Sequence, residues 1–308
     1  MIPANAAVVL LAHGSPESPD GVVEFMKHIT GGRPVDDAVL EEVRHRYVLV
    51  GKSPLTDITL AQAEALRRAL GLPVYVGMRN WRPFIAETVR QMMADGIEHV
   101  LAICLAPQNS STSVGLYRNA MMAAMKPGMD VHFVEAWHNH PLLIKAFAEK
   151  LEPLWKRAGN ETGSPAPVIF TAHSVPTRTI QAGDPYQQQA KETARLVGEQ
   201  IAGLAPELMH FAFQSQGMSG GPWLGPTVES VVLKVKQQGH SGVIIAPIGF
   251  LCDNVEVLYD VDIVFQQFAT ELGIKLWRIE SLNTAPAFIS ALGSLASERF
   301  TAAFGQPA

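Results

Sequence analysis

Short apolar runs alternate along the chain with longer segments in which apolar residues recur at helical spacing. The apolar runs predict eight β-strands, at residues 7–12, 73–78, 99–105, 131–135, 168–173, 209–214, 242–248 and 274–279. The helical spacing predicts helices that include residues 60–70, 83–95, 141–157, 187–202 and 227–238. Because strands that alternate with helices are typical of βα units on parallel sheets, we predict an α/β protein.

The predicted strands form two groups of four. A polar segment rich in Gly, Pro and Ser, residues 157–166, lies between the groups and is the best candidate boundary. A chain of 308 residues is also long for a single compact core. We therefore predict two α/β lobes, at residues 1–157 and 158–308.

The two halves echo each other in sequence at matching places. An Ala-His pair, Ala12-His13 or Ala172-His173, closes the first predicted strand of each half, and an Ala-Pro pair closes each third strand. Matching order favours an ancient duplication, although turn geometry that selects Ala and Pro at strand ends would leave similar echoes. If the duplication is real, His13 and His173 occupy equivalent strand ends facing one cleft, and ligands bind at such ends of parallel strands.

Composition narrows the class of protein. Hydrophobic residues make up 47% of the chain and charged residues 17%, which suits buried sheets and argues against disorder. A formal net charge of −5 gives no general attraction to nucleic acid or to anionic membranes. No apolar run approaches the ~20 residues of a membrane span, and the apolar N-terminus lacks a basic leader. Two cysteines, Cys104 and Cys252, are too few for a zinc or iron–sulfur cluster and suit a reducing cytoplasm.

The first segment that concentrates reactive groups after a strand is Thr171-Ala172-His173-Ser174. A histidine at a strand tip can accept a proton near neutral pH or bind a metal, because its ordinary pKa is about 6.5. A lone histidine at such a place also commonly serves as a structural hydrogen-bonding residue, so His173 is a candidate on this ground alone.

The second segment carries three carboxylates after the seventh strand. If a helix opens here, Asp253, Glu256 and Asp260 lie at i, i+3 and i+7 and share one helix face. Like charges so close raise one another's pKa, which is useful for taking up protons or passing a cation. The alternative is an acidic first turn that complements the helix dipole, and for Asp253 that alternative is at least as good. Glu256 has apolar neighbours, which makes a solvated face less natural.

Other candidates carry weaker signals. Trp223 lies between Pro and Leu in a loop sequence, where it either packs or forms an aromatic wall for a flat ligand. His138-Asn139-His140 has metal-binding side chains, but such a loop is more often only polar. No Gly-x-Gly-x-x-Gly follows a strand and no Walker sequence occurs, so nucleotide binding has little support.

Taken together, these segments resemble the ferrochelatases over nearly the whole chain. The matching pieces are residues 10–14, Ala172-His173-Ser174 with Gly183-Asp184-Pro185-Tyr186, Gln214-Ser215 with Pro222-Trp223-Leu224-Gly225-Pro226, Gly249-Phe250 with Glu256-Val257-Leu258-Tyr259-Asp260, and residues 283–286. The resemblance implies two Rossmann-like lobes, each a four-stranded parallel sheet flanked by helices, with the active cleft between them. It also implies that Fe²⁺ and a porphyrin are the substrates, that the enzyme is a monomer, and that no cofactor or iron–sulfur cluster is present.

The resemblance assigns roles to particular residues. The family's catalytic His and Glu map to His173 and Glu256, which would take up pyrrole protons or hold the metal, with Asp260 passing protons outward. The matching strand ends of the two halves, rather than the resemblance, suggest His13 as a further metal ligand. The expected substrate contacts are His13, Ile29, Arg46, Ser53, Met78, Tyr117 and Trp223.

The short segment 25–55 is similar to that of the coproporphyrin type, whereas the protoporphyrin type usually carries a longer apolar lip. The coproporphyrin type commonly has Tyr at the place of His13, His at the place of Asn80, a basic pair at Thr30-Gly31 and an acid at Val264. These departures put the outer metal site and some propionate contacts in doubt. They also leave three alternatives open: a protoporphyrin IX ferrochelatase, a cobalt or sirohydrochlorin chelatase, which His13 favours, and a haem-binding carrier without activity.

Overall fold

The computed structural model describes residues 3–125, 127–217 and 221–304. Within it the chain divides into two compact units. The first unit comprises Met1–Pro107, Ser111–Trp137 and Asn283–Ala308, and the second comprises Gln108–Ser110 and His138–Leu282.

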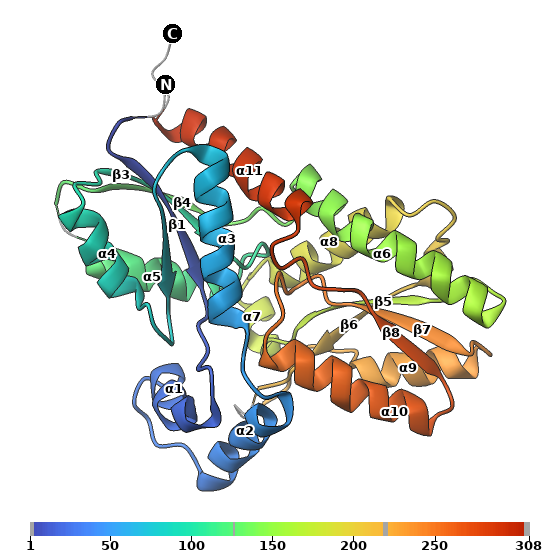
Figure 1. Cartoon of the computed structure of the whole chain (residues 1–308). Coiled ribbons are helices and arrows are strands. Elements are labelled where there is room, and N and C mark those ends of the chain that lie inside the picture. The colour runs from blue at the N-terminus through green and yellow to red at the C-terminus, as the bar shows by residue number, and fades with distance from the viewer. Residues whose placement is uncertain (1–2, 126, 218–220, 305–308) are drawn as a thin grey trace. The chain divides into compact units, whose positions relative to one another are not determined.

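The first unit is built on a four-stranded parallel sheet in the order β2-β1-β3-β4. Its strands are β1 (Ala6–Ala12), β2 (Val74–Met78), β3 (His99–Cys104) and β4 (Asp130–Val134). Its helices are the 3₁₀ turn η1 (Pro19–Gly21), α1 (Val22–Ile29), α2 (Asp37–Val50), α3 (Leu55–Leu70), α4 (Ile85–Ala94), α5 (Val114–Ala124) and α11 (Pro286–Phe304). Helices α4 and α5 cover one face of the sheet and α3 and α11 cover the other (Figure 1).

The second unit repeats this plan in the order β6-β5-β7-β8, again all parallel. Its strands are β5 (Val168–His173), β6 (Met209–Gln214), β7 (Gly242–Ala246) and β8 (Lys275–Arg278). Its helices are α6 (Pro141–Thr162), α7 (Thr177–Gln181), α8 (Tyr186–Glu199), the 3₁₀ turn η2 (Pro206–Leu208), α9 (Val228–Gln237), the π-helix η3 (Val257–Phe265) and α10 (Gln266–Glu271). Helices α6 and α8 lie on one face, and α9, η3 and α10 on the other (Figure 1).

The two sheets share one strand order, in which the first strand of each unit lies between the second and the third. This arrangement is the one that a duplication predicts, and it places the residues after β1 and at the end of β5 at equivalent positions. The predicted pair of four-stranded parallel sheets is confirmed, and every predicted strand ends within two residues of the observed one. Strands buried on both faces read as continuous apolar runs, which explains why the sequence shows them well.

The division between the units differs from the predicted one at residues 157 and 158. That boundary falls inside α6, which belongs to the second unit and ends only at Gly163, a glycine in the left-handed conformation. Helix α11, at the far end of the chain, belongs to the first unit. Helical periodicity shows that a helix has an apolar face, but it does not show which sheet that face covers, so the sequence pattern misplaced both helices.

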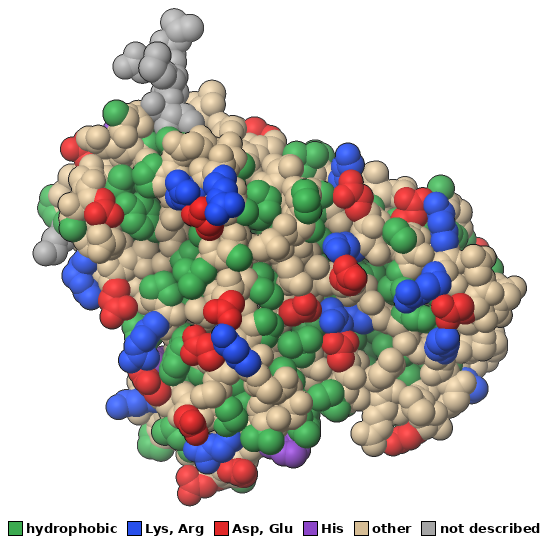
Figure 2. Space-filling model, in the orientation of Figure 1, with side chains coloured by type: hydrophobic (Ala, Val, Ile, Leu, Met, Phe, Trp, Pro, Cys, Tyr) green, Lys and Arg blue, Asp and Glu red, His purple; other side chains and the backbone are tan. Residues whose placement is uncertain are grey.

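The surface mixes charges of both signs. On the face that Figure 2 shows, Lys and Arg side chains lie beside Asp and Glu side chains. Many are neighbours one turn apart on a helix, such as Arg195 and Glu199 at 2.7 Å. Among the residues that the structure describes, no helix combines the length and the apolar character needed to cross a bilayer.

Candidate active site

His173 is the last residue of β5, and its ring is held in one orientation. Nδ1 lies 2.5 Å from the carbonyl oxygen of Ser174, which can only accept, so this nitrogen carries a proton and donates it. Nε2 is therefore the nitrogen left to act, and it lies 3.5 Å from Oε1 of Glu256. The hydroxyl of Tyr186 donates to the carbonyl oxygen of His173 at 2.9 Å and fixes the strand end.

The electrostatics of this pair favour a charged imidazole. Desolvation lowers the pKa of His173, but the charge and hydrogen bond of Glu256, the Ser174 carbonyl and the charge of Asp260 outweigh it and raise the pKa to about 9. The side chains of His173 and Glu256 are 35% and 47% exposed, so both remain accessible. At neutral pH the pair is an imidazolium beside a carboxylate, and it holds one proton.

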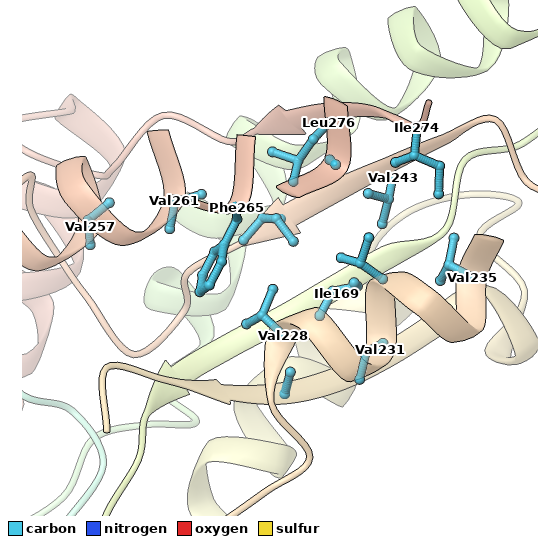
Figure 3. Close-up of a cluster of buried hydrophobic side chains, with 14 residues drawn as sticks. Ile169, Val228, Val231, Val235, Val243, Val257, Val261, Phe265, Ile274 and Leu276 are labelled. Atoms are coloured by element: carbon cyan, nitrogen blue, oxygen red, sulfur yellow. The ribbon is translucent and has the colours of Figure 1, made fainter. Parts of the chain in front are cut away.

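Glu256 and Asp260 lie on a helix of unusual geometry. The helix begins as a short α-turn at residues 255–256 and continues as the π-helix η3, whose wider turns are rare and frequently mark functional sites. The other side of η3 presents Val257, Val261 and Phe265, which point into the core beside Leu276 and Ile169 (Figure 3). Burial of this apolar face fixes the helix and leaves Glu256 to face His173.

A chain of hydrogen-bonded side chains ends at Asp260. The hydroxyl of Thr171 donates to the side-chain oxygen of Gln214 at 2.6 Å, and the Gln214 amide lies 3.4 Å from the Ser215 hydroxyl, which donates to Asp260. Ser215 has a φ of 58°, a left-handed conformation that is uncommon for serine. That conformation, directly after β6, turns the hydroxyl toward Asp260.

The prediction that three carboxylates share one helix face is wrong for Asp253. Asp253 precedes the first helical turn, and its side chain pairs with Arg278 at 3.2 Å and accepts from Ser281 at 2.8 Å. The predicted spacing requires a regular helix that begins at residue 253. The helix begins two residues later, so the i, i+3, i+7 spacing does not hold.

A close backbone approach brings the loop after β7 against the tip of β5. A Cβ at Gly249 would lie 2.8 Å from both Cα and Cβ of Ala172, the residue before His173. The Gly249 amide also donates to the carbonyl oxygen of Thr171 at 3.1 Å. Glycine is therefore needed here for the loop that leads to Glu256 to lie beside the strand that ends in His173.

Trp223 lies on a loop that is fastened to the segment after His173. The Ser174 hydroxyl donates to the Leu224 carbonyl at 2.9 Å, the Leu224 amide donates to the Val175 carbonyl at 3.0 Å, and the Thr177 amide donates to the Pro222 carbonyl at 3.0 Å. The Trp223 ring is partly exposed, and its edge closely approaches Gly217. The loop thus holds an aromatic side chain in the second unit, in which His173 also lies.

His13 directly follows β1 in the first unit and is exposed. The side-chain nitrogen of Asn80 lies 3.3 Å from both of its ring nitrogens, and the Phe25 ring stands edge-on at 5.8 Å. Two of the positions that depart from the coproporphyrin type, 13 and 80, are thus in contact with each other.

The other residues predicted to bind substrate also lie in the first unit, and most are covered. Ser53 is buried and accepts from the Ser15 hydroxyl at 2.9 Å, while Met78 and Tyr117 are buried in the core. Arg46 pairs with Glu42 at 3.1 Å and Ile29 is half-buried.

The structure brings together His173, Glu256, Asp260 and Trp223 within the second unit, and places the remaining predicted site residues in the first. His13 as a metal ligand stays a prediction. The roles of Ser215, Gly249 and Arg278 escaped the sequence argument, because contacts between residues far apart in the chain leave no local pattern.

His138 belongs to a different neighbourhood. Its Nε2 lies 2.9 Å from the Glu192 carboxylate, and that partnership lowers the pKa of Glu192. No group of three or more potential metal ligands from His, Cys, Asp and Glu occurs among residues 3–125, 127–217 and 221–304. The pair reads as a structural contact at the start of α6.

An imidazole at a strand end beside a carboxylate from the start of a helix suits both proton transfer and transient binding of a divalent cation. The fold is one that solved chelatases share. It is similar to SirB from Bacillus subtilis, solved with Fe³⁺, with a TM-score of 0.62 and 12% identity over 98% of each chain. It is also similar to CbiX, the terminal enzyme of sirohaem biosynthesis in denitrifying bacteria, with a TM-score of 0.54 and 12% identity over 97% of this chain and 99% of that one.

The chain belongs to the ferrochelatase family, whose model matches residues 5–300. It is 51% identical to a ferrochelatase from Acidobacterium capsulatum over 95% of this chain and 94% of the relative. It is 35% identical to a coproporphyrin III ferrochelatase from a Geobacillus species, over 97% of this chain and 99% of the relative. The chain is therefore a metal chelatase of haem biosynthesis that acts on iron and a porphyrin.

Proposed function

We propose that this ferrochelatase inserts Fe²⁺ into coproporphyrin III, which gives coprohaem and releases two protons, and that His173 and Glu256 carry the reaction. The observation that carries the proposal is the contact of 3.5 Å between the two side chains on accessible positions of one unit. Several relatives at 32–35% identity are coproporphyrin III ferrochelatases, which supports this porphyrin over protoporphyrin IX.

Metalation requires that two pyrrole protons leave the ring and that Fe²⁺ sheds water. A site that grips and bends the macrocycle exposes the nitrogen lone pairs, so binding energy lowers the barrier. The His173–Glu256 pair holds one proton at neutral pH, because the pKa of His173 is raised to about 9. That proton must leave before Nε2 can accept a pyrrole proton or contact the metal, and the positive charge of Fe²⁺ favours its departure.

Asp260 is suited to pass protons onward. It lies one turn beyond Glu256, its carboxylate accepts from Ser215, and only 8% of the residue is exposed. His173, Glu256 and Asp260 interact, so their protonation states are coupled. We therefore assign proton release to the three groups together and not to one of them. His13, at the equivalent strand end of the first unit, is proposed as a further metal ligand, with Asn80 restraining its ring.

The substrate is tested by anaerobic metalation of coproporphyrin III and protoporphyrin IX, each with Fe²⁺ and with Co²⁺, followed by absorbance. We expect the highest kcat/KM for Fe²⁺ and coproporphyrin III. A preference for protoporphyrin IX, or for Co²⁺, would overturn the corresponding part of the proposal. Tight haem binding without metal insertion would instead indicate a haem-binding carrier.

Three further expectations belong to this proposal: a monomer, a cytoplasmic location, and no cofactor beyond the two substrates. Cys104 and Cys252 are free and buried, and burial raises the pKa of the Cys252 thiol to about 12, so neither is poised for redox chemistry. Sedimentation of the purified protein tests the monomer, and full activity of metal-free preparations given only Fe²⁺ and porphyrin tests the last expectation.

A further inference from the structure

Arg278 is the last residue of β8, and each nitrogen of its guanidinium donates hydrogen bonds to neighbouring groups. Nε and Nη2 donate to the two carboxylate oxygens of Asp262 at 2.6 and 2.9 Å, and Nη1 donates to Asp253 at 3.2 Å. Nη1 also donates to the Ile279 carbonyl at 3.2 Å, and the Ser281 hydroxyl donates to Asp253 at 2.8 Å. The Arg278 side chain is only 16% exposed, so these contacts are partly shielded from water.

The two aspartates lie on either side of the candidate catalytic carboxylates in the chain. Asp253 comes before the helix, and Asp262 lies within η3, beyond Asp260. A π-helix is rare and occurs mostly as a short insertion within an α-helix. Glu256 directly precedes η3, so its position depends on how both ends of the segment are held. The apolar side of η3 anchors it to the core, but hydrophobic contacts alone tolerate small shifts.

We propose that Arg278 is a positioning residue that holds Asp253 and Asp262 together and thereby sets the turn that presents Glu256 to His173. The proposal rests on the proposed function, in which these two side chains carry metalation. None of the Arg278 hydrogen bonds named above reaches His173 or Glu256. Arg278 acts instead through the backbone between Asp253 and Asp262.

The chemistry of the side chain explains why arginine stands here. A guanidinium presents donors in a fixed planar fork, so it can hold one carboxylate with two bonds and a second carboxylate with a third. A lysine ammonium keeps the charge but is a point donor without this fork. Unlike an exposed ion pair, which is worth little, this cluster joins β8, the loop before the helix and η3 in a largely covered place.

The test compares Arg278→Lys and Asp262→Asn with the wild type in anaerobic Fe²⁺ insertion into coproporphyrin III, with kcat and the porphyrin Kd measured separately. We expect kcat to fall ~10-fold or more in both variants, because small misplacement of a reacting group is costly, while the porphyrin Kd changes less than about twofold. Asp262 is 38% exposed, so its variant serves even if Arg278→Lys fails to fold.

Lys275→Gln is the matched control. Lys275 lies on the same strand, and its variant loses an exposed ion pair with Glu161 and a cation–π contact with Trp277 but no contact with Asp253 or Asp262. It should keep both kcat and Kd. Wild-type kcat in Asp262→Asn and in folded Arg278→Lys, or equal losses in Lys275→Gln, would overturn the proposal. His173→Ala and Glu256→Gln are run beside them: if these retain activity, the proposed function fails, whereas their inactivity with fully active Asp262→Asn refutes only the role of Arg278.

Discussion

At the scale of single residues, the raised pKa of His173 and its proposed role together predict how metalation depends on pH. In the proposed reaction the pair must lose its proton before it can act, so we expect kcat/KM for Fe²⁺ to rise between pH 7 and pH 9. The same shift stabilises the fold. Because the pKa is higher in the folded state than its ordinary value of 6.5, this contribution is complete below pH 6.5 and disappears as pH rises through about 9.

Titration of the His173 ring by NMR checks the cause. In Glu256→Gln the largest favourable charge is gone while burial still opposes the imidazolium, so the pKa should fall well below 9. An ordinary pKa for His173 in the wild type, or a rate that falls between pH 7 and pH 9, would contradict this view of the resting pair.

Gly249 gives a second prediction at this scale. In Gly249→Ala the new methyl meets backbone at 2.8 Å, so the loop and the end of β5 must separate. We expect a loss of ~1–3 kcal/mol in the free energy of unfolding, together with a loss of activity through displacement of His173. Gly159→Ala in α6 is the control, because its Cβ would come no closer than 3.6 Å to any neighbour. A Gly249→Ala variant with the stability and activity of the wild type would refute the close approach of Gly249 to Ala172.

At the scale of elements, the π-helix depends on its buried side for its position. Phe265, at its end, is 5% exposed and packs with Val261 and Leu276 (Figure 3). Phe265→Ala should cost ~3–5 kcal/mol in urea unfolding. Leu233→Ala, at an exposed position of α9, should cost less than about 0.5 kcal/mol. Similar costs for the two variants would show that η3 is not seated in this core.

The strands and the candidate pair were predictable from sequence for a physical reason. Buried parallel strands are apolar throughout, and His173 and Glu256 lie next to such strands or among apolar neighbours, so local sequence marks them. Asp253 was misread because the start of a helix and its change to π geometry depend on packing. Arg278 acts across about 25 residues of sequence, and no local pattern reports such an ion pair.

At the scale of the whole molecule, each unit is completed by a helix from outside its own βα series. Helix α11 follows the last strand of the second unit, yet it buries Phe288, Leu292 and Phe300 in the first, where it packs on α3 and β3. Loop connections decide this membership, and the apolar pattern of a helix is the same whichever sheet it covers. The predicted lobe of residues 1–157 therefore lacks one of its covering helices.

The assignment of α11 to the first unit predicts how fragments of the chain behave. Residues 1–137 expressed alone should aggregate or remain unfolded, because the face of the sheet that α11 covers is exposed to water. The same fragment joined by a flexible linker to residues 283–304 should be markedly more soluble and show cooperative thermal unfolding by circular dichroism. Cooperative folding of residues 1–137 without α11 would contradict the assignment of this helix to the first unit.

One imidazole and one carboxylate of the second unit, those of His173 and Glu256, are proposed to carry iron insertion. The most direct measurement is single-turnover metalation of coproporphyrin III with Fe²⁺ under anaerobic conditions, for the wild type, His173→Ala and Glu256→Gln. We expect rapid insertion by the wild type and a loss of at least ~100-fold in the insertion rate of each variant, with porphyrin still bound. Insertion at the wild-type rate in either variant would contradict this proposal.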